Sequence, residues 1–133
     1  GLVGSEMCIR DRNEVVADFE KSDLFEHVTE RYDMIVSNPP YIKTEEIVKL
    51  MPEVSEFEPV QALDGKEDGL FFYRKIIKEC RDYLNPGGYV LFEIGYDQGE
   101  AVSELMTKAG YGQVVVKKDL AGLDRIVCGV YTE

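Results

Sequence analysis

The chain contains 133 residues, of which 44% are hydrophobic and 31% are charged, a length that favours one domain with a hydrophobic core. Its formal net charge of −11 argues against nucleic acid as a direct partner, because affinity for a phosphate backbone comes mostly from Lys and Arg. The longest apolar runs, such as Tyr89 to Ile94, are too short to span a membrane, so we expect a cytoplasmic protein without a membrane partner.

The first coherent elements follow an irregular beginning. Residues 1–12, GLVGSEMCIRDR, show neither strand alternation nor a helical stripe, and we predict that they are a non-native or disordered leader. From Val15 to Lys21 hydrophobic and polar residues roughly alternate, which predicts a short strand that ends at Ser22–Glu26. The segment Tyr32 to Ser37 is almost continuously apolar after Asp33, which favours a strand covered on both faces.

A long polar stretch, Lys43 to Asp68, comes next and is expected to carry a helix near Glu45 to Met51. Asp68 is the predicted N-cap of a further helix, whose apolar residues recur at helical spacing. These residues are Leu70, Tyr73, Ile77, Cys80 and Leu84. The sequence Asn85-Pro86-Gly87-Gly88 predicts the turn that ends this helix.

The remaining elements complete an α/β pattern. Tyr89 to Gly95 reads as a buried strand, Gln98 to Lys108 as a helix, and Gln113 to Lys118 with Arg125 to Thr132 as an antiparallel pair. Strands that alternate with helices predict an open sheet with helices on its faces. Ligands of such sheets bind outside the carboxyl ends of the strands, where the tetrapeptide Asn38 to Tyr41 is expected.

This tetrapeptide, Asn-Pro-Pro-Tyr, forms a corner rich in hydrogen-bond acceptors. The Asn38 side chain supplies a carbonyl oxygen, and Pro39 and Pro40 have no N–H group that competes for the neighbouring carbonyl oxygens. Two such acceptors suit a planar NH₂ group, against which Tyr41 can stack, and they would orient its nitrogen as a nucleophile. The alternative is a stiff turn followed by an ordinary core aromatic, but the position directly after a buried strand favours a functional site.

Other polar and thiol side chains do not form a site with metal-ligand spacing. His27 is expected at the surface, and the three cysteines are expected to be inert thiols outside any disulfide framework. An acidic cluster is interpreted as a solvated loop face rather than a metal site. Its members are Glu53, Glu56, Glu58 and Asp64.

Beyond the tetrapeptide, longer stretches resemble release factor glutamine methyltransferases, which are class I methyltransferases. The stretches are SDLFE, YDMIVSNPPYI, EVSEFEPVQALDGKEDGLFFYRKI, LNPGGYVLFEIGYDQGEAV and DLAGLDRIVCGVY. The resemblance implies that residues 13–133 are the C-terminal part of a methyltransferase catalytic domain. The implied fold is a partial Rossmann-like sheet that keeps strands 3 to 7 of a seven-stranded sheet in the order 3-2-1-4-5-7-6, with a terminal antiparallel pair.

The resemblance also implies a reaction and its residues. S-adenosyl-L-methionine would donate a methyl group to the glutamine side-chain nitrogen in the Gly-Gly-Gln motif of a peptide chain release factor. Asn38, Pro39, Pro40 and Tyr41 would form the catalytic clamp on the substrate. The cofactor-binding residues would be Asp23, Leu24 beside the adenine, and Asn38.

Two elements of the family pattern are missing upstream of Ser22, namely a glycine-rich turn for the methionine part of the cofactor and an acidic residue for its ribose. We therefore expect the chain alone to bind the cofactor weakly and to be inactive. Three alternatives stay open. They are a ribosomal-protein glutamine methyltransferase, a nucleic-acid adenine amino methyltransferase, which the acidity disfavours, and a non-catalytic interaction module.

Overall fold

A computed structural model of the chain describes residues 22–50 and 62–132. The chain divides into two units, residues 1–30 and residues 31–133. Within the first unit, Ser22 closes a turn, since its hydroxyl oxygen accepts the His27 backbone N–H at 2.9 Å and donates to the Leu24 carbonyl at 3.0 Å. The predicted leader 1–12 and the predicted strand Val15 to Lys21 lie outside the described residues.

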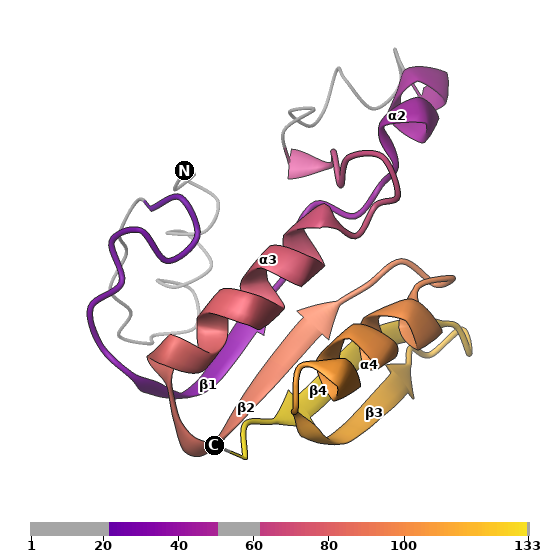
Figure 1. Ribbon diagram of the computed structural model, residues 1–133. Coiled ribbons are helices and arrows are strands. Elements are labelled where there is room, and N and C mark those ends of the chain that lie inside the picture. Colours follow the sequence, from indigo (N-terminus) through magenta and orange to yellow (C-terminus); the bar gives the residue numbers. More distant parts are fainter. Residues whose placement is uncertain (1–21, 51–61, 133) are drawn as a thin grey trace, which may run out of the picture. The chain divides into compact units, whose positions relative to one another are not determined.

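The second unit is built on a four-stranded sheet with the order β1-β2-β4-β3 (Figure 1). The strands are β1 (Tyr32–Ser37), β2 (Leu84–Glu93), β3 (Gly112–Lys118) and β4 (Asp124–Val130). β1 and β2 are parallel, whereas β4 runs antiparallel to both β2 and β3. The predicted α/β fold with a terminal antiparallel pair is therefore confirmed, and the four strands are neighbours in the predicted order. Their numbering within a longer sheet stays a prediction.

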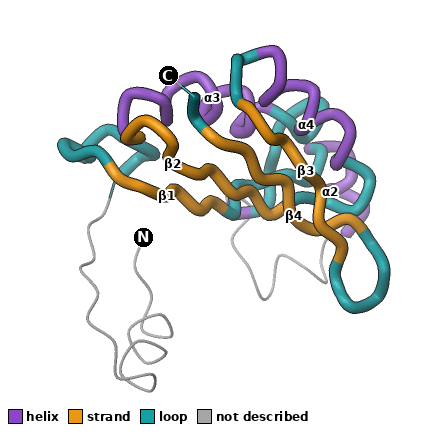
Figure 2. Tube along the Cα trace, turned by 90° about the horizontal axis from the view of Figure 1, so that it is seen from below, coloured by secondary structure: helices purple, strands orange, loops and turns teal. Residues whose placement is uncertain are grey.

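The helices are α2 (Thr44–Leu50), α3 (Phe71–Glu79) and α4 (Gly99–Lys108), and a short 3-10 helix, η2 (Cys80–Tyr83), continues α3. Seen along the sheet, α3 and α4 lie on the same face (Figure 2). Their apolar sides bury the alternate residues of the strands beneath them, which forms the hydrophobic core. Side chains that are fully buried include Tyr73, Leu84, Val90, Phe92, Val102, Met106 and Val127. No helix of the described residues has the length and apolar character needed to cross a membrane.

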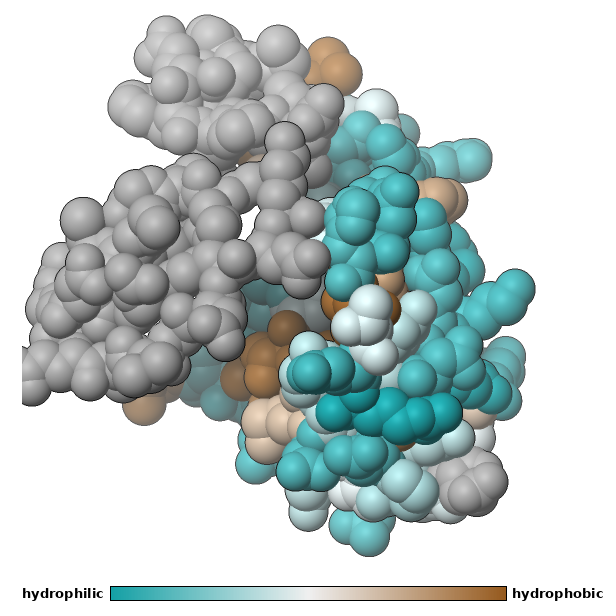
Figure 3. All heavy atoms as spheres, turned by 90° about the vertical axis from the view of Figure 1, so that its left-hand side faces the viewer, coloured by the Kyte–Doolittle hydropathy of each residue, from teal (hydrophilic) through white to brown (hydrophobic). Residues whose placement is uncertain are grey.

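Within the part of the chain that the structure describes, the opposite face of β1 is open, which corrects the prediction of a strand covered on both faces. Tyr32, Met34 and Val36 alternate along β1 and are 43%, 53% and 69% exposed, and Tyr89 beside them on β2 is 49% exposed. Successive strand residues point to opposite faces, and α3 and α4 cover only one of these. Figure 3, which views the side that carries β1, shows hydrophobic side chains gathered at the surface.

The predicted turn Asn85 to Gly88 is also corrected, because these residues belong to β2. The pairing of β1 with β2 jumps from Tyr32↔Leu84 to Met34↔Tyr89, so the four residues form a bulge in the strand. Gly87 has a φ of +82°, and its N–H donates to the Tyr131 carbonyl at 2.8 Å. The bulge is thus held by a partner that local sequence does not reveal.

The predicted N-cap of α3 is wrong by two residues. Leu70 occupies the N-cap position, and its own side chain makes no capping hydrogen bond. Asp68 instead accepts the Leu70 backbone N–H at 2.9 Å and forms an ion pair with Arg74. The Arg74 interaction holds the pKa of the Asp68 carboxyl below its usual value. The sequence correctly predicted the Asp68 carboxylate near the start of this helix. Its ion pair with Arg74, in the first turn of α3, holds it outside the N-cap position.

Candidate active site

The tetrapeptide Asn38 to Tyr41 lies directly after the carboxyl end of β1, as expected. The chain that follows is fixed by backbone hydrogen bonds to the segment 63–66. Ile42 donates its N–H to the Leu63 carbonyl at 3.0 Å, and its own carbonyl accepts the Gly65 N–H at 2.7 Å. Because both polar groups of Ile42 are paired, the residue that follows Tyr41 has a defined backbone position.

The Asn38 side chain is exposed and has no hydrogen-bond partner within residues 22–50 and 62–132. Pro39 is buried beside it, and Pro40 is half-buried. Asn38, Pro39 and Tyr41 line a cavity of about 270 Å³, which we call the proline-loop cavity. Its other lining residues are Ile42, Ala62, Leu63 and Glu93. Three members of the predicted clamp therefore share one cavity.

Three glycines approach Tyr41 closely, two of them in the loop before α3 and one just after β2. A Cβ atom on Gly65 would lie 2.8 Å from the Tyr41 Cα, and one on Gly69 would lie 2.5 Å from the Tyr41 carbonyl oxygen. A Cβ on Gly95 would lie 3.2 Å from two carbons of the Tyr41 ring. At Gly65 and Gly69 these backbone atoms leave no room for a side chain, whereas at Gly95 the Tyr41 ring would have to shift by a few tenths of an ångström.

Gln98 also contacts the Tyr41 backbone. From the sequence, we predicted only that this residue begins a helix. Its side chain is 9% exposed and hydrogen-bonds to three backbone groups. Oε1 accepts the Gly95 N–H at 2.9 Å, and Nε2 donates to the carbonyls of Tyr41 at 3.0 Å and Gly69 at 3.4 Å. A buried amide whose donors and acceptor are all used is a strong positional constraint.

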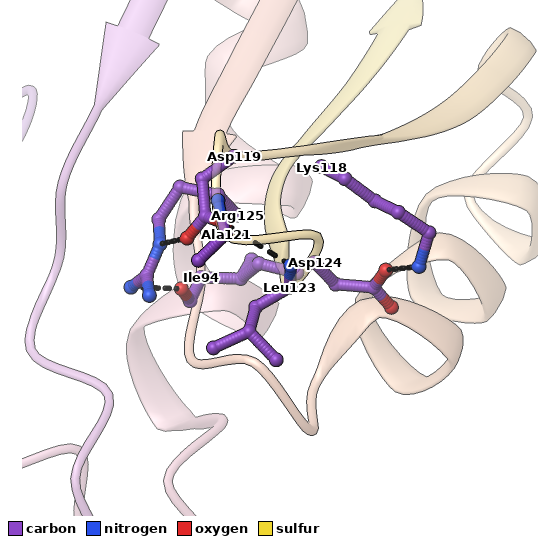
Figure 4. Close-up of polar contacts among 7 residues, drawn as sticks. All are labelled: Ile94, Lys118, Asp119, Ala121, Leu123, Asp124 and Arg125. Atoms are coloured by element: carbon purple, nitrogen blue, oxygen red, sulfur yellow. Dashed lines mark hydrogen bonds and ion pairs between the residues drawn. The ribbon is translucent and has the colours of Figure 1, made fainter.

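A second cavity, of about 440 Å³, is also lined by Tyr41, together with charged residues of both signs. Arg125 is one of them, and Figure 4 shows it between Asp119 and Ile94. Its guanidinium donates to the Asp119 carboxylate at 3.4 Å and to the Ile94 carbonyl at 3.2 Å. Hydrogen bonds from the backbone N–H groups of Leu123 and Ala121, and then from Arg125, lower the pKa of the Asp119 carboxyl.

The carboxyl end of β2 is joined to α3 by a buried hydroxyl. Tyr73 is fully buried and donates to the Glu93 carbonyl at 2.6 Å. Burial raises the pKa of the Tyr73 phenol, so it remains protonated and acts as a donor. Glu93 lines the proline-loop cavity, and Tyr73 thereby fixes the backbone of one wall.

Asp23 and Leu24, the predicted neighbours of the cofactor, belong to the first unit. They lie in a turn in which the Asp23 carbonyl accepts the Glu26 N–H at 3.1 Å and Leu24 has a φ of +53°. The clamp residues belong to the second unit, and each unit is described by itself. Their cofactor role stays a prediction.

Among the described residues, no group of three or more His, Cys, Asp or Glu side chains lies close enough together to hold a metal ion. His27 is exposed, as predicted. Cys80 is a buried free thiol 2.9 Å from the Tyr111 hydroxyl, and Cys128 is also free. In the acidic cluster only Asp64 is described, and it bonds to Thr44 and Lys66; Cys8 and the three glutamates lie outside the described residues.

No protein-family model matches the chain. Curated relatives do match, among them the release factor glutamine methyltransferase of Clostridium botulinum, which is 51% identical over 110 residues. The Geobacter sulfurreducens enzyme of the same name is 47% identical over 112 residues. The chain belongs to the release factor glutamine methyltransferase family. The two alignments cover 80% and 84% of the chain but 39% of each relative, so the chain spans less than half the length of these family members.

Solved structures agree at the level of the fold. A methyltransferase from Pyrococcus furiosus superposes with a TM-score of 0.54 at 22% identity, covering 80% of this chain and 44% of that one. This match supports a class I methyltransferase fold for the segment. It carries no information on the substrate, because the identity is too low.

Proposed function

We propose that the chain is part of an enzyme that methylates the glutamine side-chain nitrogen in the Gly-Gly-Gln motif of peptide chain release factors. The observation that carries the proposal is the exposed Asn38 amide, which has no partner within the described residues and lines a cavity with Pro39 and Tyr41. Family membership supports the substrate, since the curated relatives are named for it. Translation termination occurs in the cytoplasm, which is where this activity would place the protein.

The clamp would act by orienting the substrate amide. An amide nitrogen is a poor nucleophile, because its lone pair is conjugated with the carbonyl group. The Asn38 side-chain oxygen and a carbonyl oxygen next to Pro39 or Pro40 would accept the two N–H groups of the glutamine. These acceptors would fix the direction of attack and stabilise positive charge as it develops on nitrogen. Tyr41 would pack against the amide plane. As the carbon–sulfur bond breaks and the neutral thioether leaves, the cationic methylated amide would release one proton to water, so no general base is required for the transfer itself.

S-adenosyl-L-methionine would supply the methyl group, which it carries on a positively charged sulfur. The fit of this chain to the cofactor rests on Asn38, whose amide offers both a donor and an acceptor beside a cavity of about 270 Å³. Asp23 and Leu24 are the further residues that we propose to hold it. The role of Asn38 would be to bind both the cofactor and the substrate, so that the reacting atoms meet at one side chain.

A chimera tests the proposal. Residues 22–132 replace the matching segment of the Clostridium botulinum relative, and the chimera is incubated with S-adenosyl-L-methionine and a release factor. We expect one methyl group on the glutamine of the Gly-Gly-Gln motif by mass spectrometry. A release factor with glutamate in place of this glutamine is the control, because it lacks the nitrogen. Methylation of a ribosomal protein or of adenine in DNA, with none on the release factor, would contradict the proposal.

A further inference from the structure

Gln98 joins three segments of the chain that are distant in sequence. It lies 57 residues from Tyr41 and 29 residues from Gly69, yet its Nε2 donates to the carbonyl oxygens of both. Its Oε1 accepts the N–H of Gly95, at the end of β2. Among the described residues, Gln98 carries the only amide or charged side chain in the buried class. The end of β2, the start of α3 and the loop after β1 therefore meet at one side-chain amide.

The packing around this amide leaves the Tyr41 backbone little freedom. The backbone of Gly69 approaches the Tyr41 carbonyl so closely that an added Cβ would be 2.5 Å from the oxygen and 3.0 Å from Nε2 of Gln98. Gly65, in the same loop as Gly69, packs against the Tyr41 Cα. The carbonyl therefore cannot turn toward a different donor without moving the surrounding backbone, and Gln98 sets its direction.

A change at the Tyr41 carbonyl would reach the clamp through the two prolines. The pyrrolidine rings lock φ at Pro39 and Pro40, so few backbone dihedrals between Tyr41 and Asn38 can absorb a displacement. A tilt of the Tyr41 peptide would shift the proline carbonyls and the Asn38 side chain together. Orientation is the main contribution proposed for these groups, and small displacements then have large effects on rate.

We infer that Gln98 is a positioning residue for the methyl transfer, which holds the Tyr41 carbonyl and thereby sets the geometry of the Asn-Pro-Pro-Tyr clamp. The inference rests on the proposed function. Gln98 contacts backbone groups of the clamp and of its neighbours rather than the substrate. Its loss should therefore lower kcat much more than it changes KM for the release factor or the cofactor.

Two variants of the chimera test this role. Gln98→Met removes all three hydrogen bonds at similar side-chain length. Gln98→Glu keeps the acceptor for the Gly95 N–H and, when ionised, lacks the donors for the carbonyls of Tyr41 and Gly69. We expect kcat to fall on the order of a hundredfold in both, with KM values close to those of the unsubstituted chimera. Glu104→Gln is the control, because this side chain lies on α4 and is 61% exposed.

Hydrogen exchange on the 133-residue chain provides a readout that does not depend on catalysis. We expect both substitutions to speed exchange of the Ile42 and Gly65 amides, which bond the loop after Tyr41, and to leave Val90 and Val127 in the core protected. If Gln98→Met unfolds the chain, Gln98→Glu is the variant that tests the positioning role, since it retains the hydrogen bond from the Gly95 N–H at the start of α4.

An unchanged kcat in Gln98→Glu, or in a folded Gln98→Met, overturns the positioning role. A chimera that is inactive before any substitution contradicts the proposed function instead, and hydrogen exchange then decides on Gln98. In that case unchanged protection of Ile42 and Gly65 in both variants overturns the inference, whereas faster exchange confined to them supports it.

Discussion

The hydroxyl of Thr44 lies 2.6 Å from a carboxylate oxygen of Asp64, which joins the beginning and the end of a segment that spans 20 residues. Asp64 also accepts the Lys66 backbone N–H at 2.9 Å, and the Lys66 carbonyl accepts the Thr44 N–H at 3.0 Å. These bonds continue the backbone pairing of Ile42 with the segment 63–66. The position of the loop after Tyr41 thus depends in part on one ionised carboxylate.

The first prediction concerns the titration of Asp64. The Thr44 hydrogen bond, followed by the Lys66 backbone bond, lowers the pKa of this carboxyl. We predict that Thr44→Val raises it toward the ordinary value of about 3.9, whereas Thr44→Ser, which keeps a hydroxyl, leaves it low. NMR titration of the Asp64 carboxyl measures both. An identical titration in Thr44→Val and the unsubstituted chain would contradict the hydrogen bond.

The same shift has a consequence for stability. Because the folded-state pKa is lower than the unfolded one, ionised Asp64 stabilises the fold fully above about pH 4, and this contribution is lost as the pH falls through the folded-state pKa. Thermal unfolding of Thr44→Val should therefore differ most from that of the unsubstituted chain above pH 4. The difference should shrink at lower pH.

The second prediction compares two glycines with similar backbone conformations. Gly69 has a φ of +77° and Gly122 a φ of +83°, so alanine at either position costs about 1 kcal/mol of backbone strain. At Gly122 nothing lies within 4 Å of the added Cβ, whereas at Gly69 it meets the Tyr41 carbonyl oxygen. We expect Gly69→Ala to lose about 1–3 kcal/mol more in the free energy of unfolding, because the carbonyl must leave its donor on Gln98. Equal losses in chemical denaturation would show that Tyr41 is less constrained than we infer.

The sequence predicted elements well where the signal is local. The apolar run of Tyr32 to Ser37 matches β1 residue for residue, and the helical pattern of Gln98 to Lys108 matches α4 within one residue. Asn38 and its neighbours were placed at the carboxyl end of a strand by the same reasoning. Hydrophobic patterns and prolines act through near neighbours, so they can be interpreted without tertiary contacts.

Features that depend on distant partners could not be predicted. The bulge at Gly87 is held by Tyr131, and Gln98 has its partners on two other segments. Nothing in the pattern around Gln98 distinguishes it from an ordinary first residue of a helix. The open face of β1 was missed for a related reason, since a continuous apolar run indicates that both faces are hydrophobic but not what covers them.

The third prediction concerns the clamp itself. In the chimera, Asn38→Ala should reduce the rate of methyl transfer on the order of a hundredfold, because it removes one of the two oriented acceptors. The free energy of unfolding should change by less than about 0.5 kcal/mol, since the side chain is exposed and unpaired within the described residues. Tyr41→Ala should also slow methyl transfer, because it removes the ring that packs against the amide. Tyr41→Phe keeps the ring and should slow transfer less. Near-normal transfer by Asn38→Ala would exclude the proposed clamp.

The last prediction compares the two faces of the sheet through two valines, one on β1 and one on β2. Val36 is 69% exposed on the open face, whereas Val90 is 0% exposed beneath the helices. Threonine has nearly the shape of valine but carries a hydroxyl group. We expect Val90→Thr to lose about 1–3 kcal/mol in the free energy of unfolding of the 133-residue chain, because its hydroxyl is buried. Val36→Thr should change it by less than about 0.5 kcal/mol. Similar losses would contradict an open face, and a larger loss from Val36→Thr in the chimera than in the chain would show that residues outside 22–132 cover it there.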